Sequence, residues 1–239
     1  MSEAHEADID GGGSHKGEQT RARIKRAALT LFAQKGLDGV SVREILKLAG
    51  QKNAGSINYY FSSRADLVQE LIRDVAVILD EHHTRRLDAL EAAGGPHTLR
   101  ELAEILIDAP SLSDPNRQED DRSLRFLNMV LLNHRQNLFD AMRGLDGGTR
   151  RCLTRMREMM PEIPQRILAQ RQMLAMIYVI GATSTREAAR DDPDAWARLW
   201  GGEATRETLA DTVVGIMTAP VDAATLAALA RDEARGQAV

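Results

Sequence analysis

The sequence of 239 residues has one cysteine and no long apolar run. Cys152 cannot form an intrachain disulfide, and a cysteine-based zinc site needs several thiolates. A single thiol is consistent with a reducing cytoplasm, which is the location that we expect. No apolar stretch reaches the ~18 residues typical of a membrane-spanning helix. Residues 1–17 are acidic and glycine-rich and lack the apolar segment of a secretory signal, so we predict a disordered tail there.

The short motifs of common enzyme active sites are also missing. There is no Gly-rich phosphate loop, no Gly-x-Ser-x-Gly elbow, no His-Glu-x-x-His motif and no cysteine pair. His82 and His83 are adjacent, so on a helix they point to different faces and do not form a paired metal site. We therefore predict that the chain is not an enzyme and needs neither a cofactor nor a metal.

An overall excess of positive charge is lacking too, since the net charge is −4. The average hides an asymmetry, because residues 18–64 hold nine basic side chains against three acidic ones, a local charge of +6. Both the segment before residue 18 and the chain after residue 64 are acidic. A basic segment on an acidic body is typical of a small DNA-reading module attached to a second domain. Chance clustering on a solvated helix face is the alternative that charge alone leaves open.

Apolar residues recur at helical spacing along almost the whole chain, which predicts an all-α fold. Glycine and proline supply the breaks, of which Gly94, Gly95 and Pro96 form the clearest. The predicted helices cover residues 18–35, 41–49, 54–61, 63–92, 98–109, 118–144, 149–160, 162–190, 203–218 and 222–235. We predict an N-terminal helix-turn-helix module at 18–64, joined by a long helix to a larger helical body at 65–239.

Local signals mark the second and third helices of this module. Ser41 and Glu44 have the spacing of a capping box, and Ser63 begins the long helix in a similar, weaker way. Gly50 breaks the second helix, and a polar turn leads into the third. Leu48, Ile57 and Phe61 are expected in the core. Two short helices joined by a tight turn are typical of a helix-turn-helix, whose second helix enters the major groove of DNA.

The residues of this segment resemble the TetR family of regulators. The resemblance rests on the residues from 41 to 50, on Ser-Ile-Asn-Tyr-Tyr-Phe at 56–61 and on Ser-Arg-Ala-Asp-Leu at 63–67. The first helix, with Ala28, Leu31, Phe32 and Gly36, is also similar to that family. The close match covers about residues 18–72. The turn is one residue longer than in most members, which places the sequence in a subset of the family.

The resemblance implies a set of DNA contacts: Ser41, Arg43, Lys52, Asn53, Gly55, Ser56, Asn58, Tyr59, Tyr60 and Arg64. Arg43 suits a bidentate contact to the O6 and N7 atoms of guanine, and Asn58 suits the edge of adenine. Tyr59 suits a thymine methyl group or a phosphate, and Arg64 matches a phosphate anchor. Packing of Tyr60 beneath Phe61 is the alternative for that side chain.

The resemblance further implies a small-molecule effector and a two-fold dimer that reads a palindromic operator in double-stranded DNA, with repression as the expected outcome and activation as the alternative. A dimer also follows from geometry, because two modules related by C2 symmetry match two half-sites. Our candidates for the effector pocket are Phe126, Met129, Val130, Asn133, His134, Asn137 and Tyr178. Our candidates for the dimer interface are Ile167, Leu174, Ile177, Gly181, Leu209, Val213, Ile216 and Met217. For both sets, ordinary core packing within one chain is the alternative.

A different function class stays open at this point. A protein-interaction module that has kept a helix-turn-helix shape without reading DNA would show the same periodicity. Salt separates the two classes, because a protein that binds phosphates loses DNA affinity steeply as the salt concentration rises.

Overall fold

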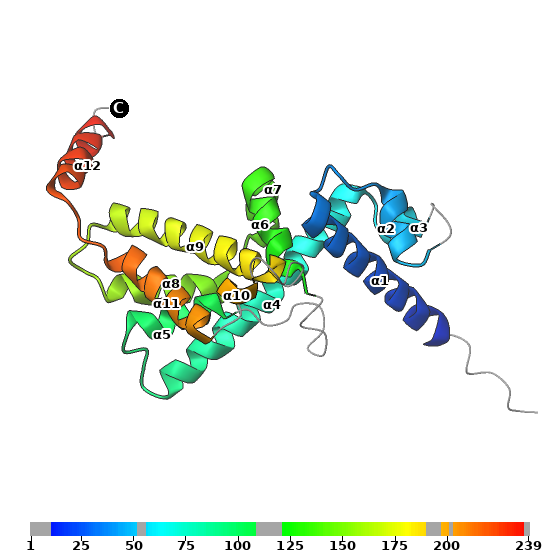
Figure 1. Cartoon of the computed structure of the whole chain (residues 1–239), viewed down its shortest axis with the longest axis horizontal. Helices are drawn as coiled ribbons and strands as arrows, with labels where there is room; N and C mark the ends of the chain where they lie inside the picture. Colours follow the sequence, from blue (N-terminus) through cyan, green and yellow to red (C-terminus); the bar gives the residue numbers. More distant parts are fainter. Residues whose placement is uncertain (1–10, 52–55, 109–120, 190–196, 201–202, 237–239) are drawn as a thin grey trace, which may run out of the picture.

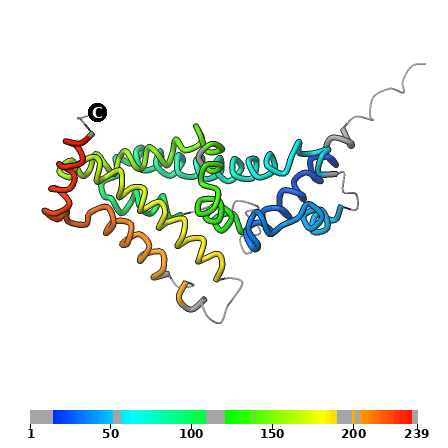
Figure 2. The backbone as a smooth tube through the Cα atoms, turned by 90° about the horizontal axis from the view of Figure 1, so that it is seen from above, coloured from blue at the N-terminus to red at the C-terminus, as the bar shows by residue number. Residues whose placement is uncertain are grey.

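The computed structural model describes residues 11–51, 56–108, 121–189, 197–200 and 203–236 of the chain. Within these ranges the secondary structure consists of helices, and no strand is present. The all-α prediction is confirmed. The first three helices lie at one end of an elongated molecule and the last helix lies near the other, as both views show (Figure 1 and Figure 2).

Three helices form the N-terminal module: α1 (Gly11–Lys35), α2 (Val42–Leu48) and α3 (Ser56–Tyr60). α1 buries Ile24, Ala28 and Phe32, which follow one another at the four-residue spacing of a helix face. It begins at Gly11, so part of the segment predicted as a disordered tail belongs to a helix, while residues 1–10 lie outside the described ranges. The charged and glycine-rich composition at 11–17 gave no apolar periodicity from which to place this start.

The predicted capping box at the start of α2 is confirmed. The Ser41 hydroxyl accepts a hydrogen bond from the Glu44 backbone N–H at 3.3 Å, and the Glu44 carboxylate accepts one from the Ser41 backbone N–H at 2.8 Å. Lys35 donates to the same carboxylate. This bond, with those from Ser41, lowers the pKa of Glu44 to about 2. The box therefore fixes where α2 begins and ties it to the end of α1.

One core prediction in α2 is wrong, because Leu48 is 55% exposed. The buried side chains of α2 and its C-cap are Ile45, Leu46 and Ala49, with Val42 half-buried. At about 100° per residue these four share one face, and Leu48 lies more than a quarter turn from its centre. Leu46, which is 3% exposed, lies closer to the centre of this face than Leu48 does.

The long helix α4 (Arg64–Ala92) connects the module to the body. The body consists of α5 (Leu99–Ile107), α6 (Ser123–Asn133), α7 (Arg135–Met142), α8 (Gly147–Glu158), α9 (Gln165–Ala188), α10 (Ala197–Trp200), α11 (Glu203–Thr218) and α12 (Ala223–Gly236). The single helix predicted at 118–144 is wrong, since it is broken at His134 into α6 and α7. His134 is neither glycine nor proline, so the apolar periodicity continues across the break without a signal.

Two apolar core clusters hold the fold together. The N-terminal core cluster joins the module to the first half of α4, to α6 and to α7, and its centre is Ile24, Phe32, Ile45, Phe61, Leu67, Leu71, Phe126 and Val130. In it, Phe32 of α1 stacks on Phe126 of α6 with ring centroids 6.3 Å apart. The C-terminal core cluster joins the end of α4 to α5, α8, α9 and α11, and its centre is Leu87, Leu102, Ile105, Met156, Leu168, Leu209 and Val213. The module thus packs directly on α6 as well as being linked through α4.

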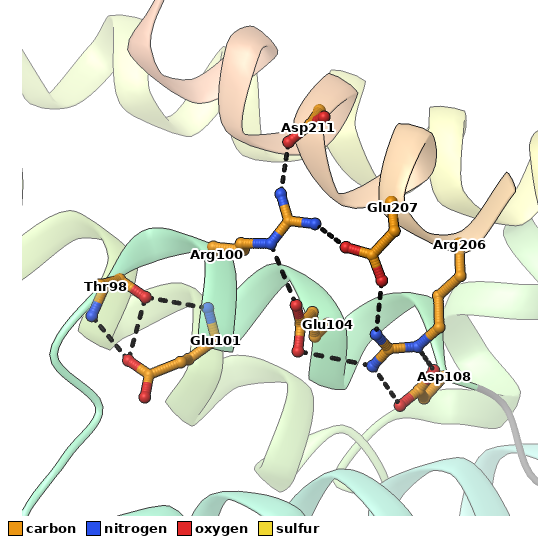
Figure 3. Close-up of polar contacts among 8 residues, drawn as sticks. All are labelled: Thr98, Arg100, Glu101, Glu104, Asp108, Arg206, Glu207 and Asp211. Atoms are coloured by element: carbon orange, nitrogen blue, oxygen red, sulfur yellow. Dashed lines mark hydrogen bonds and ion pairs between the residues drawn. The ribbon is translucent and has the colours of Figure 1, made fainter. Parts of the chain in front are cut away.

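A network of ion pairs fixes α11 against α5 (Figure 3). Arg206 of α11 makes two contacts of 3.1 Å with the carboxylate of Asp108, which raise the pKa of this guanidinium. Arg100 of α5 contacts Glu207 and Asp211 across the same interface. A single exposed ion pair contributes little to the free energy of unfolding. Apolar packing holds the two helices together, and the network of ion pairs sets their register.

No individual helix in the described ranges combines the length and the apolar character needed to cross a membrane. The pair α11 and α12 meets that requirement only jointly, across a bend of 58°, and α11 packs in the C-terminal core cluster.

Candidate DNA-binding surface

The third helix of the module presents two side chains to solvent at the end of the molecule. Ile57 and Phe61, four residues apart, are buried as predicted and fix α3 on the module. Asn58 is exposed, and Tyr59 as a whole residue is 82% exposed. An aromatic residue this exposed on a helix fixed by its other face is suited to contact a partner.

Tyr60 has an intermediate position that bears on its two interpretations. It is half-buried and packs against the N-terminal core cluster, and its ring meets that of Tyr59 edge-on with centroids 4.9 Å apart. Tyr60 therefore packs partly against the core, as the alternative interpretation predicted, and remains partly exposed. The ring also supports Tyr59 in its exposed position.

The predicted contacts at the start of α2 lie on the surface. Arg43 is exposed and forms no ion pair within the described part of the chain. Ser41 is exposed as well, although its hydroxyl is engaged with Glu44. Because α2 and α3 pack on each other, Arg43 and Asn58 belong to one small unit.

Four predicted contacts fall at the turn and the start of α3. Lys52, Asn53 and Gly55 lie outside the described residues. Ser56 begins α3, but its side chain is outside the description too.

Arg64 differs most from its expected role as a phosphate anchor. It is half-buried, its guanidinium carbon lies 5.4 Å from the centroid of the Phe32 ring, and it donates a hydrogen bond to the carbonyl oxygen of Leu37. A guanidinium engaged in this way stabilises the module and is not available to a phosphate in this conformation. Phe32 and Leu37 lie about 30 residues away in sequence, so no local pattern indicated this contact.

The first helix places its basic residues in two ways. Arg21 and Lys25 form ion pairs with Glu70 of α4, and Lys25 also pairs with Asp74. Arg23 is exposed and donates only to the Thr20 hydroxyl among the described residues. A part of the basic charge counted in the sequence is thus neutralised by α4.

The seven predicted effector contacts do not come together around one described cavity. Phe126 and Val130 are fully buried in the N-terminal core cluster, and Met129 packs against it. Asn133 and Asn137 are exposed, and His134 lies 4.0 Å from Asp38. Tyr178 packs against the other, C-terminal core cluster. For Phe126 and Val130 the core alternative holds.

Two histidines of α4 are polar features of the body that the sequence did not single out as binding residues. The Nε2 atoms of His82 and His83 are buried without a hydrogen-bond partner in the part of the chain that is described. His83 Nδ1 is 2.8 Å from the Thr149 hydroxyl, and burial lowers the pKa of His83 to about 4. His83 is therefore neutral near pH 7. The described residues contain no group of three or more side chains suited to a metal ion.

The eight predicted dimer residues divide into two groups. Ile167, Leu209, Val213 and Met217 are buried in the C-terminal core cluster, which agrees with the alternative of packing within one chain. Leu174 and Ile177 of α9 are 56% and 43% exposed. Gly181 and Ile216 are partly buried. Of the predicted dimer residues, Leu174 and Ile177 therefore form an exposed apolar stripe on α9.

Comparisons with known proteins agree with the helix-turn-helix. Residues 24–71 match the family model described as bacterial regulatory proteins, tetR family. The probable HTH-type transcriptional regulator YttP of Bacillus subtilis is 32% identical over 100 residues, which are 41% of this chain and 46% of YttP. The match thus spans less than half of that relative.

The fold as a whole is similar to a solved structure, that of a TetR-type regulator from Shewanella sp. PV-4. The TM-score is 0.57 at 18% identity, covering 81% of this chain and 95% of the other, which bears on the fold alone. The matched residues 24–71 include α2, α3 and the exposed Asn58 and Tyr59. Residues 24–71 thus match the DNA-binding module of the tetR family of bacterial regulatory proteins, and the fold of the chain is similar to that of a TetR-type regulator.

Proposed function

We propose that this protein is a sequence-specific, DNA-binding transcriptional regulator that binds a palindromic operator as a homodimer in the cytoplasm. The observation that carries the proposal is the exposure of Arg43, Asn58 and Tyr59 on two short helices whose other faces are buried. Rigid backbone with free side chains is what direct reading of base edges in the major groove requires.

The side chains divide into two roles in this proposal. Arg43 and Asn58 read bases, since they have the donors and acceptors that guanine and adenine pair with. Ser41, Tyr59 and Tyr60 position the module on phosphates or on a thymine methyl group. Contacts from Lys52, Asn53, Gly55 and Ser56 are part of the same proposal by family resemblance. Arg64 is left out because it packs on Phe32.

The dimer in this proposal forms through α9. Met173 and Leu174 are exposed, Ile177 lies one turn further along the same face, and open space adjoins Gly181 at the next turn. An apolar stripe of this kind is costly in water unless a second copy covers it. We propose repression by occupancy, in which a small effector in the body moves α4 and changes the separation of the two α3 helices.

Selection of binding sites from random duplexes, followed by anisotropy titrations, tests the DNA-binding part. Arg43→Ala and Asn58→Ala should each weaken specific binding by about 1–3 kcal/mol, because each removes a bidentate contact. Arg235→Ala is the matched control, since it removes one positive charge from α12 at the far end of the molecule. Unchanged affinity in both α2 and α3 variants would refute the docking scheme. A complete absence of DNA binding at low salt would favour a protein-interaction module instead.

A further inference from the structure

A cleft with a cavity volume of about 740 Å³ lies where the DNA-binding module meets the body. One wall is α1, and the others come from Leu48 and Ala49 at the end of α2, from α4 and from the start of α6. The volume falls in the range of about 300–1,000 Å³ that is typical of small-molecule sites. None of the seven residues predicted for the effector pocket lines it.

Positive charge dominates the lining of this cleft. Arg21 and Lys25 are neutralised by Glu70 and Asp74. Arg23 and Arg26 also line the cleft and form no ion pair in the described part of the chain. They lie three residues apart on α1 and therefore on neighbouring positions of its surface.

The acidic lining is smaller than the basic one. Glu18 and Asp74 are its two carboxylates, and Asp74 is already paired with Lys25. A basic, partly enclosed surface attracts an anion, and the attraction is stronger away from bulk water.

Apolar surface and a buried hydroxyl complete the site. Leu48, which is exposed where a core position was predicted, forms part of the cleft wall together with Leu29 and Val75. Ser123 also lines the cleft, is almost fully buried, and its Oγ has no hydrogen-bond partner among the described residues. An unpartnered buried hydroxyl is costly, and a ligand oxygen that bonds to it removes that cost.

We infer that this cleft binds an anionic small molecule with an apolar body, such as an aromatic or aliphatic carboxylate, sulfonate or phosphate. The anion lies against Arg23 and Arg26, and the apolar part covers Leu48. The site is separate from the effector site proposed in the body. A ligand in it contacts α1 and α2 of the module and α4 and α6 of the body, so it couples the two. Its charge also reduces the positive potential of the DNA-binding module.

Fluorescence titration with 8-anilinonaphthalene-1-sulfonate tests the inference on the full chain without DNA. The probe should bind this site, and the neutral N-phenyl-1-naphthylamine should bind it more weakly. Arg26→Gln should raise the Kd of the sulfonate about threefold or more, because an ion pair in a partly enclosed site is lost. Ala22→Trp, which adds an indole to an exposed lining position of α1, should remove one equivalent of bound probe.

Matched variants outside the cleft separate this site from any other. Arg235→Gln makes the same charge change and Ala92→Trp the same size change at exposed positions far from the lining, and both should leave binding unaltered. Circular dichroism checks that each variant is folded. If Ala22→Trp is not folded, the Kd measured for Arg26→Gln decides the test. Unaltered stoichiometry and Kd in a folded Arg26→Gln variant overturn the inference. DNA binding is measured separately, so failure here leaves the proposed function intact.

Discussion

At the scale of single residues, Arg64 packs inside the module where a phosphate contact was predicted. Its guanidinium packs over Phe32 and donates to the Leu37 carbonyl, and its buried Nε has no partner in the described part of the chain. Arg64→Ala should therefore lower the free energy of unfolding by about 1–3 kcal/mol through the lost cation–π contact and hydrogen bond. Urea titration followed by circular dichroism measures this loss.

DNA titrations then distinguish the packing role of Arg64 from that of a phosphate anchor. At a temperature where the variant is folded, the slope of log affinity against log salt should stay that of the parent protein, because no phosphate contact is lost. A slope smaller by about one unit would instead assign Arg64 to a phosphate. Arg43→Ala should show the opposite pattern, with weaker DNA binding and unchanged stability, because Arg43 is exposed.

His83 gives the body a dependence on pH. Burial, with a smaller effect of His82, lowers its pKa from 6.5 to about 4, while Asp108 acts in the opposite direction. Between these values the unfolded chain binds more protons than the folded one, so stability falls as the pH falls from about 6.5 to about 4. The shift corresponds to about 3 kcal/mol.

The urea midpoint at pH 7 and at pH 4.5 measures this effect. His83→Gln should show a smaller decline between the two values than the parent protein, because its side chain does not titrate. His97→Gln, at an exposed position, should decline as the parent does. Equal declines in all three proteins would contradict the role of His83.

At the scale of helices, the sequence predicted what local signals determine. The Ser41 box, the four-residue spacing in α1 and the limits of α11 at 203–218 all follow from caps, periodicity and glycine breaks. The break at His134 and the exposure of Leu48 do not, because both depend on which neighbours each helix packs against. Periodicity identifies a helix more reliably than it identifies the centre of a buried face.

The difference between identifying a helix and identifying its buried face also explains why some predicted dimer residues of α9 and α11 are buried and others are exposed. Both helices have apolar residues around much of their circumference, so the sequence alone did not distinguish the inner from the outer face. In the fold, Leu209 and Val213 point into the C-terminal core cluster, whereas Leu174 and Ile177 point away from it. Contacts between helices distant in the sequence therefore determine which face of α9 and of α11 is buried.

At the scale of the whole molecule, the N-terminal core cluster crosses the predicted domain boundary at residue 64. Phe32 of the module stacks on Phe126 of the body, so a movement of α6 acts on α1 directly as well as through α4. The contact joins positions 94 residues apart, so no local sequence pattern indicated it. The site on α2 and α3 could be predicted from the sequence, because the residues that resemble the family form one local, continuous pattern.

If the protein binds DNA as the proposed dimer, its DNA affinity depends on the α9 surface, which is far from α3. Ile177→Arg places a charge in the exposed stripe of α9 and should convert the protein to a monomer in light scattering coupled to gel filtration. Affinity for the selected palindrome should fall by about 100-fold or more, since two linked half-site contacts become one. Binding to a single half-site should be unchanged. Leu226→Arg on α12 is the control, because both side chains are 43% exposed and only Ile177 belongs to the stripe. A persistent dimer in the Ile177 variant would place the interface elsewhere on the body.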